Sequence, residues 1–353
     1  MDISVYLKQV VESGSPDLHL KVGRVPMVRL SNGELYEMEN SELVTAKVVE
    51  ELIHQILSEE HFKRFQQKEE VDTSYAVMGV GRFRVNVFWD TEGPAVAFRA
   101  IPVEIPSLDS LSLPPILKTF TQKSKGLFVV TGPTGSGKST TLAAMVNEIN
   151  RNKRVHIITI EDPIEFVHSS QMALLTQREV GTHTLSFPSA IRAALREDPN
   201  VILVGEMRDL ETISAAITLA ETGHLVLATL HTQDAPQTID RMIDIFPPNQ
   251  QSQIRAQLST TLIGVMAQRL IPRADNTGRV LATEILVRND AITNCIKEGN
   301  THQIYSMMQI GKSDGMVTLD ASLVELYKQG LISEQDMLLR ARDPELIANL
   351  VQG

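Results

Sequence analysis

Apolar and polar side chains alternate in the first third of the chain in a way that predicts a small sheet. In the segment 81–89 apolar residues occupy every second position, and Arg82, Arg84 and Asn86 stand between them. This period of two predicts a strand with one buried face. Strands are also predicted at 18–22, 26–30 and 95–101, and a helix where apolar residues recur at positions 49, 52, 53, 56 and 57. Residues 1–101 are therefore predicted to form a small α+β domain.

A different pattern occupies the rest of the chain. Four near-continuous apolar runs rich in Val, Ile and Leu lie at 127–131, 155–160, 201–204 and 225–230. Such runs predict strands buried on both faces, as in a parallel sheet covered by helices. Helices are predicted at 189–196 and 214–220, and from about residue 286 onward. The prediction is an α/β domain with a largely parallel core sheet over 117–353. Four prolines in 102–116 predict an extended linker between the two domains.

A glycine-rich segment connects the first of these apolar runs to a helical pattern. Its residues are Gly132, Pro133, Thr134, Gly135, Ser136, Gly137, Lys138, Ser139 and Thr140. They match the phosphate-binding P-loop, whose backbone N–H groups turn toward an anion at a helix N-terminus. Lys138 is predicted to reach the β- and γ-phosphates of ATP, and the Ser139 hydroxyl to ligate Mg²⁺. The alternative, a glycine-rich surface turn, gives no reason for the Lys-Ser pair.

Polar residues follow the other three apolar runs. Ligands of open parallel sheets bind at the carboxyl ends of the strands, so these residues are expected beside the P-loop. Glu206 is the candidate to orient the attacking water, and Glu161 is a second candidate for Mg²⁺. His231 is a candidate to sense the γ-phosphate or to hydrogen-bond Glu206, and His224 precedes the last run. The alternative for each histidine is a structural role.

Phosphoryl transfer also needs a cation to balance the charge of the transferring group. Two candidates, Arg192 and Arg196, are four residues apart on the helix predicted at 189–196, although they could instead pair with acids such as Glu197. The other candidates belong to the first domain, where a solvated strand face is the alternative interpretation: Arg82, Arg84 and Arg99. If these three act, we expect them to do so across a subunit boundary in a ring.

Composition narrows the possible functions. The chain has 353 residues, enough for about two domains. A net charge of −10 argues against a broad nucleic-acid surface. Cys295 is the only cysteine, which excludes a disulfide framework and a CxxC metal site. The sequence lacks an apolar run long enough for a membrane span and begins without the basic region of a signal peptide. A cytoplasmic location is expected, with any membrane contact made through a partner.

Four motifs in fixed order now resemble those of a known family. The segments 132–140, 159–166, 202–209 and 223–232 resemble the Walker A, Asp-box, Walker B and His-box motifs of the secretion ATPases of type II secretion and type IV pili. The short first domain, the absence of a tetracysteine motif and the segment 291–304 make the chain most similar to the PilT-type retraction ATPases. In that last segment Thr293 and Cys295 depart from the family pattern of Arg and Leu.

The resemblance implies a homo-hexameric ring of RecA-like P-loop NTPase domains, each preceded by a PAS-like domain. It implies that Glu206 is the catalytic glutamate, Glu161 the Asp-box acid, and His224 and His231 the His-box pair. Arginines of the first domain would approach a nucleotide held between the domains. The expected function is ATP-driven pilus retraction in twitching motility, with docking to the inner-membrane platform protein at the pilus base. The alternatives are a pilus assembly or secretion ATPase, a DNA-dependent translocase, and a regulatory nucleotide-binding module without turnover.

Overall fold

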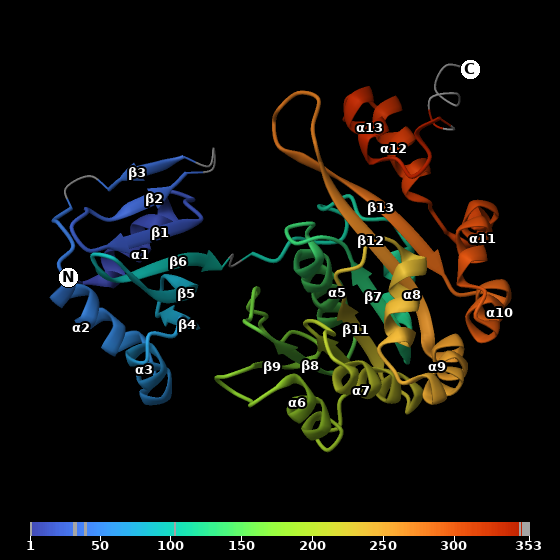
Figure 1. The fold of residues 1–353 in the computed structure, drawn as a ribbon, viewed down its shortest axis with the longest axis horizontal. Helices are drawn as coiled ribbons and strands as arrows, with labels where there is room; N and C mark the ends of the chain where they lie inside the picture. Colours follow the sequence, from blue (N-terminus) through green and yellow to red (C-terminus); the bar gives the residue numbers. More distant parts are fainter. Residues whose placement is uncertain (1, 31–33, 39–40, 102–103, 346, 348–353) are drawn as a thin grey trace. The chain divides into compact units, whose positions relative to one another are not determined.

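The computed structural model describes residues 2–30, 34–38, 41–101, 104–345 and 347. They form two compact units, which are considered separately (Figure 1). Unit 1 comprises Met1–Glu104 with Pro163–Val167, and unit 2 comprises Ile105–Asp162 with His168–Gly353.

Unit 1 is built on an antiparallel sheet of six strands in the order β3-β2-β1-β6-β5-β4. Three helices share one apolar core with the sheet. The elements are α1 (Ile3–Glu12), β1 (Asp17–Lys21), β2 (Met27–Arg29), β3 (Leu35–Glu37), α2 (Ala46–Ile56), α3 (Glu59–Gln66), β4 (Val71–Val77), β5 (Gly81–Asp90) and β6 (Gly93–Ile101).

The alternation seen in the sequence is the reason for this core. On β5, Phe83, Val85 and Val87 are fully buried, whereas Arg82 and Arg84 lie on the other face. The apolar stripe of the predicted helix is buried along α2 against the same sheet. The predicted α+β character of this region is therefore confirmed.

Unit 2 is built on a sheet of seven strands in the order β13-β12-β7-β11-β10-β8-β9. All neighbouring pairs are parallel except β12 with β13. The strands are β7 (Gly126–Thr131), β8 (His156–Glu161), β9 (Leu174–Glu179), β10 (Val201–Val204), β11 (Leu225–Thr229), β12 (Leu262–Pro272) and β13 (Arg279–Val287).

Helices cover both faces of this sheet (Figure 1). They are α4 (Ile116–Gln122), α5 (Lys138–Asn152), α6 (Phe187–Ala194), α7 (Leu210–Glu221), α8 (Ala235–Asp244), α9 (Pro248–Thr261), α10 (Asp290–Glu298), α11 (Ile304–Ile310), α12 (Leu319–Lys328) and α13 (Glu334–Arg340).

The two faces of β7 explain why its four central residues, 127–130, are all apolar. Leu127 and Val129 point into the core that contains α6 to α9, and Phe128 and Val130 point into the core under α4 and α5. A strand that serves two cores needs apolar side chains on both faces. The four predicted strands, the parallel sheet and the C-terminal helices are confirmed.

Two features differ from the prediction. The helix predicted at 189–196 is shorter at its end, because α6 stops at Ala194 and Arg196 lies in the turn that follows. Strands β9, β12 and β13 were not predicted; β12 starts directly after α9 without a break and carries polar residues such as Gln268 and Arg269. No helix of the described residues is long and apolar enough to cross a membrane.

Candidate active site

A glycine-rich loop connects β7 to α5, and its glycines adopt backbone conformations that other residues rarely adopt. Gly132, Gly135 and Gly137 have positive φ angles of 139°, 76° and 88°. At Gly132 a Cβ atom would also lie 2.4 Å from the backbone oxygen of Gln268 on β12. Only glycine fits this position, so the loop turns closely around the start of α5. No side chain caps α5, so the positive end of the helix faces the loop as in an anion-binding site.

Lys138, the first residue of α5, crosses back over this loop. Its side chain is buried, and its Nζ donates hydrogen bonds to the carbonyl oxygens of Gly132 at 2.8 Å and Pro133 at 3.1 Å. The same Nζ lies 3.5 Å from Nδ1 of His231. The ammonium group is therefore held at the mouth of the loop, in contact with the end of β11.

The parallel register brings the ends of β10 and β11 to the same edge of the sheet. Glu206 follows β10 by two residues and His231 follows β11 by two. Glu206 Oε2 lies 3.6 Å from His231 Nε2 and forms an ion pair with Nε of Arg208 at 2.7 Å. Lys138, His231, Glu206 and Arg208 thus form a continuous row of charged and polar groups, of which sequence reasoning had predicted the first three.

The electrostatics of this row keep His231 neutral near pH 7. Burial lowers the pKa of His231, and the positive charge of Lys138 lowers it further, whereas the contact with Glu206 acts in the opposite direction. A neutral imidazole can bridge a cation on one ring nitrogen and a carboxylate on the other. His231 therefore lies in contact with both Lys138 and Glu206 and can relay a change from one to the other.

Glu161 occupies the carboxyl end of β8, beside β10. Its Oε1 accepts hydrogen bonds from the Thr159 hydroxyl at 2.6 Å and from Nε2 of Gln177 at 3.2 Å. The carboxylate is therefore held as an oxygen donor at the edge of the sheet where the P-loop begins. Among the described residues no group of three or more His, Cys, Asp or Glu side chains is placed to hold a metal by itself.

His224 lies at the other end of β11. Its Nδ1 is 3.0 Å from the carbonyl oxygen of Leu219 and 3.3 Å from the Thr222 hydroxyl, in the turn between α7 and β11. The whole strand separates it from His231, so the structure does not bring His224 together with Glu206 in one subunit. Its predicted catalytic role stays a prediction that this placement does not support.

The arginines named from the sequence all have partners within their own unit. Arg82 donates to the Ser74 hydroxyl at 2.7 Å. Arg84 lies 3.6 Å from Asp72, and Arg99, its register partner across β5 and β6, pairs with Asp17 at 2.7 Å. The trio shares one sheet face of unit 1, and its action on a nucleotide stays a prediction.

The two arginines proposed within unit 2 have other positions than expected. Arg192 on α6 contacts Glu211 on α7. Glu197, the partner considered in the alternative interpretation, pairs with Arg178 at 3.0 Å. Because α6 ends before Arg196, the expectation that Arg192 and Arg196 share one helical face is wrong.

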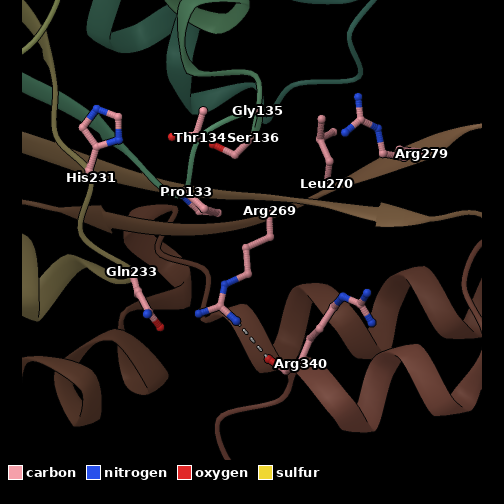
Figure 2. Close-up of a pocket in the computed structure, with 10 residues that line it drawn as sticks. All are labelled: Pro133, Thr134, Gly135, Ser136, His231, Gln233, Arg269, Leu270, Arg279 and Arg340. Atoms are coloured by element: carbon pink, nitrogen blue, oxygen red, sulfur yellow. Dashed lines mark hydrogen bonds between the residues drawn. The ribbon is translucent and has the colours of Figure 1, made fainter. Parts of the chain in front are cut away.

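A cleft of about 440 Å³ opens beside the P-loop (Figure 2). Its cationic lining comes from Arg269 on β12, Arg279 at the start of β13, and Arg340 at the end of α13. Arg340 pairs with Asp336 at 2.5 Å, and Arg269 donates to the Arg340 carbonyl at 3.4 Å. Among the described residues neither Arg269 nor Arg279 has a carboxylate partner. Figure 2 shows the Arg279 guanidinium on the same side of the strands as Gly135 and Ser136.

A larger cavity of about 950 Å³ shares Ser136, Leu270 and Arg279 with this cleft. Its other walls are the segment Ser110–Pro114, the start of α5, the β12–β13 hairpin and α12. Gln268, buried at 1% exposure, lines it and donates through Nε2 to the Thr141 hydroxyl at 2.9 Å. Neither the arginines nor this cavity could be found from the sequence, because β12 and β13 were not predicted and no local motif marks their residues.

The comparisons with known proteins decide the family. The family model described as "Type II/IV secretion system protein" matches residues 2–343. The chain belongs to this family. It is 47% identical to the type IV pilus retraction ATPase PilT of Pseudomonas aeruginosa, over 98% of this chain and 99% of that protein. It is 48% identical to a twitching motility protein of Neisseria gonorrhoeae, over 91% of this chain and 85% of that protein.

A solved structure agrees with these relatives. The crystal structure of a pilus retraction motor PilT with bound ADP is 46% identical, has a TM-score of 0.92 and covers 99% of each chain. The chain is therefore an ATP-hydrolysing enzyme of the type IV pilus retraction kind, with the mixed α/β fold and mostly parallel sheet predicted for it.

Proposed function

We propose that this chain is one subunit of a homo-hexameric motor in which ATP hydrolysis at the P-loop cleft retracts type IV pili. The observation that carries the proposal is the row of contacts from Lys138 through His231 to Glu206 at the carboxyl edge of the sheet. This row joins a phosphate-binding cation to a carboxylate placed to orient water, as hydrolysis requires. Similarity over the full length of a pilus retraction ATPase supports retraction as the work performed.

In the proposed mechanism the triphosphate of ATP lies in the P-loop, where Lys138 exchanges its loop carbonyl partners for phosphate oxygens. His231 contacts Lys138 and Glu206, so it registers this exchange. Glu206 then orients the attacking water toward the γ-phosphorus. Bound Mg²⁺ would neutralise phosphate charge, and the half-buried Ser139 and Glu161 would supply oxygen ligands of the kind it prefers.

The cation that the P-loop alone lacks has two proposed sources. Arg279 and Arg269 line the cleft within unit 2, and Arg82, Arg84 and Arg99 of unit 1 are proposed to act across a subunit boundary. A site completed by a neighbour explains why the motor works as a ring. The ring is proposed to dock on the inner-membrane platform protein at its cytoplasmic face, so that its membrane association is only through this partner.

The adenosine part of ATP is proposed to lie in the larger cavity. That cavity begins at Thr140 and Thr141 on the first turn of α5 and has apolar walls from Leu113, Leu270 and Leu281. Apolar walls with a few polar groups are typical of sites for a flat base. Arg279 borders both cavities, so it would lie where the base-bearing half of the nucleotide meets the phosphates.

The test is Glu206→Gln in the purified full chain. Binding of a fluorescent ATP analogue is expected to stay intact, whereas steady-state phosphate release falls by about 100-fold or more. Glu221→Gln on α7, whose partner is Gln257 at 2.8 Å, is the matched control and should hydrolyse ATP normally. Unchanged turnover in Glu206→Gln would contradict the proposal that Glu206 orients the attacking water.

Counting surface pili in a deletion strain distinguishes a retraction motor from an assembly motor. Loss of a retraction motor leaves surplus pili that do not retract, whereas loss of an assembly motor leaves none. ATPase activity that rises strongly on adding DNA would instead favour a translocase, which the net charge of −10 disfavours.

A further inference from the structure

A chain of hydroxyl groups runs from the end of β7 to the first turns of α8. The hydroxyl of Thr131, the last residue of β7, lies 2.8 Å from the carbonyl oxygen of Thr232 and 2.7 Å from its hydroxyl. The Thr232 hydroxyl lies 2.7 Å from that of Thr238 on α8. The Thr238 hydroxyl in turn donates to the carbonyl oxygen of Asp234 at 2.7 Å. Both end members, Thr131 and Thr238, are fully buried.

The number of hydroxyl protons fixes the direction of this chain. Each hydroxyl has one proton to donate, and that of Thr238 goes to the Asp234 carbonyl, because a carbonyl oxygen only accepts. Thr232 must therefore donate to Thr238. Thr131 must donate to Thr232, where its proton is shared between the carbonyl and the hydroxyl oxygen. All three protons thus point from the P-loop side toward α8, and hydrogen bonds in such a row strengthen one another.

The contact between Thr131 and Thr232 closes a ring that includes the P-loop lysine. Gly132 follows Thr131 directly, and His231 precedes Thr232 directly. Lys138 Nζ donates to the Gly132 carbonyl at 2.8 Å and lies 3.5 Å from Nδ1 of His231. The ammonium group therefore lies between two segments that the threonines hold together.

The backbone pairing of β7 with β11 stops just before these threonines. Strand β11 ends at Thr229, and one further backbone hydrogen bond joins the Leu230 N–H to the Val130 carbonyl at 3.1 Å. Thr131 and Thr232 continue the connection through their side chains where the strands no longer pair. The position of the loop that carries His231 thus depends on hydroxyl groups.

The far end of the chain is held by the sheet. The backbone N–H of Ala235, the first residue of α8, donates to Oε1 of Glu284 at 2.8 Å. Glu284 lies in the middle of β13, opposite Ala267 of β12, and is 2% exposed. The side chain of Asp234 caps the same helix by accepting from the Gln237 N–H at 2.8 Å. The start of α8 therefore gives the hydroxyl chain a fixed end.

We infer that Thr131 and Thr232 are positioning residues for ATP hydrolysis, because their hydroxyl contact fixes His231 in the catalytic row. The inference rests on the proposed role of His231. In the proposed mechanism Lys138 exchanges its loop carbonyl partners for phosphate oxygens, so its contacts with the loop change when ATP binds. The contact between the threonines does not involve Lys138, so it persists during the exchange and keeps His231 within reach of Glu206.

The experiment replaces Thr131 by valine in the full-length protein. Valine keeps the shape of the side chain but donates no hydrogen bond, so the His231 loop loses both of its contacts with the Thr131 hydroxyl. We expect kcat for ATP to fall about tenfold while KM changes less than about twofold. Thr131→Ser keeps the hydroxyl, and its kcat is expected to stay within about twofold of the wild type.

Thr121→Val is the matched control. Thr121 lies on α4, is fully buried, and donates through its hydroxyl to the Lys118 carbonyl at 2.8 Å. This variant loses a buried hydrogen bond of the same kind without touching the catalytic row. It is expected to lower the melting temperature and leave kcat unchanged. An equal loss of kcat in both valine variants would overturn the inference, because general destabilisation would then explain the loss.

Titration of His231 by NMR gives a readout that needs no hydrolysis. Burial and the charge of Lys138 lower the pKa of His231, Glu206 raises it, and Arg208 lowers it further. A loop that moves away from these groups becomes more exposed. The pKa of His231 is therefore expected to rise toward its ordinary value of 6.5 in Thr131→Val and to stay unchanged in the serine and control variants. A His231→Asn protein identifies the signal.

Three results would overturn the inference directly. They are a wild-type kcat in Thr131→Val, an unshifted pKa of His231 in that variant, and a serine variant as slow as the valine variant. If Glu206→Gln hydrolyses ATP normally, the proposed catalytic row fails, whereas the titration of His231 still decides whether the threonines hold its loop.

Should Thr131→Val fail to fold, Thr232→Val tests the same chain from its middle. This variant loses the hydroxyl contacts with Thr131 and Thr238, while Thr131 still donates to the carbonyl of residue 232. Because one contact remains, kcat is expected to fall about threefold. A wild-type kcat together with a wild-type pKa of His231 in this variant would overturn the inference as well.

Discussion

The pH dependence of stability gives a direct test of the buried charge at Glu284. Burial raises the pKa of this side chain from its ordinary value of 4.5 to about 7. The folded protein therefore favours the protonated form more than the unfolded chain does. The resulting stabilisation is fully present below pH 4.5 and is lost as the pH rises through about 7.

The size of the effect follows from that displacement of the pKa. It corresponds to about 3 kcal/mol of unfolding free energy, of which about 2 kcal/mol are lost between pH 5.5 and 8.5. A glutamine at position 284 does not titrate. The difference in unfolding free energy between Glu284→Gln and the wild type should therefore shift by about 2 kcal/mol in favour of glutamine over this range.

The assay must report on unit 2 alone. Trp89, the only tryptophan, lies on β5 of unit 1 and is silent about Glu284. Cys295, the only cysteine, is 6% exposed on α10 and belongs to the core of unit 2. Pulsed labelling of this thiol along a urea series, with a reagent that reacts at acid pH, therefore measures the unfolding of unit 2. Both proteins are compared at one protein concentration, because assembly adds to apparent stability.

One pattern of results refutes this account. If the wild type and Glu284→Gln keep a constant difference from pH 5.5 to 8.5, the carboxyl does not titrate in this range in the fold. The conclusion would be that its hydrogen bond from Ala235 on α8 outweighs its burial. A difference that shifts in favour of the wild type as the pH rises would contradict the sign worked out above.

Three further predictions concern the site. Gly132→Ala places a Cβ atom 2.4 Å from a backbone oxygen of β12. It should therefore destabilise unit 2 by about 1–3 kcal/mol and abolish nucleotide binding in a filter assay. The control Gly135→Ala, with open space around it, should retain binding. Arg279→Ala should lower kcat/KM for ATP by about 10- to 100-fold; Arg273→Ala in the same hairpin, whose exposed pair with Asp275 is worth little, should leave it unchanged. Neutralising all three unit 1 arginines should abolish turnover, and mixing that protein with a Lys138→Ala protein should restore part of it; no recovery in mixed rings would contradict action across subunits.

Local patterns were enough to predict the centre of unit 2. Each central strand needs apolar residues on both faces, so its sequence identifies it, and the residue that follows each strand is then known to lie at one edge of the sheet. This is why the sequence alone predicts that Lys138, Glu206 and His231 lie together, and the structure brings them into contact.

The remaining groups of the site depend on contacts between distant segments. Arg279 and Gln268 reach the P-loop only because β12 lies beside β7, and no periodicity in their own segment indicates that pairing. Glu284 has the sequence context of an ordinary acid in an apolar strand, and only the fold shows that the first N–H group of α8 donates to its carboxylate. His224 differs from these residues, because a motif groups it with His231 although a whole strand separates the two within one subunit, and its catalytic role stays a prediction.

The division of charges within the site suggests how hydrolysis is controlled. Lys138, His231 and Glu206 follow or lie beside buried central strands, so the sheet sets their spacing. The candidate cations lie instead on the hairpin of β12 and β13 and on unit 1. Phosphate binding and charge compensation are thus assigned to different parts of the chain. In the proposed mechanism such a site binds ATP through the P-loop and hydrolyses it only when a cation completes it, which is the property a motor needs to couple each turnover to a movement.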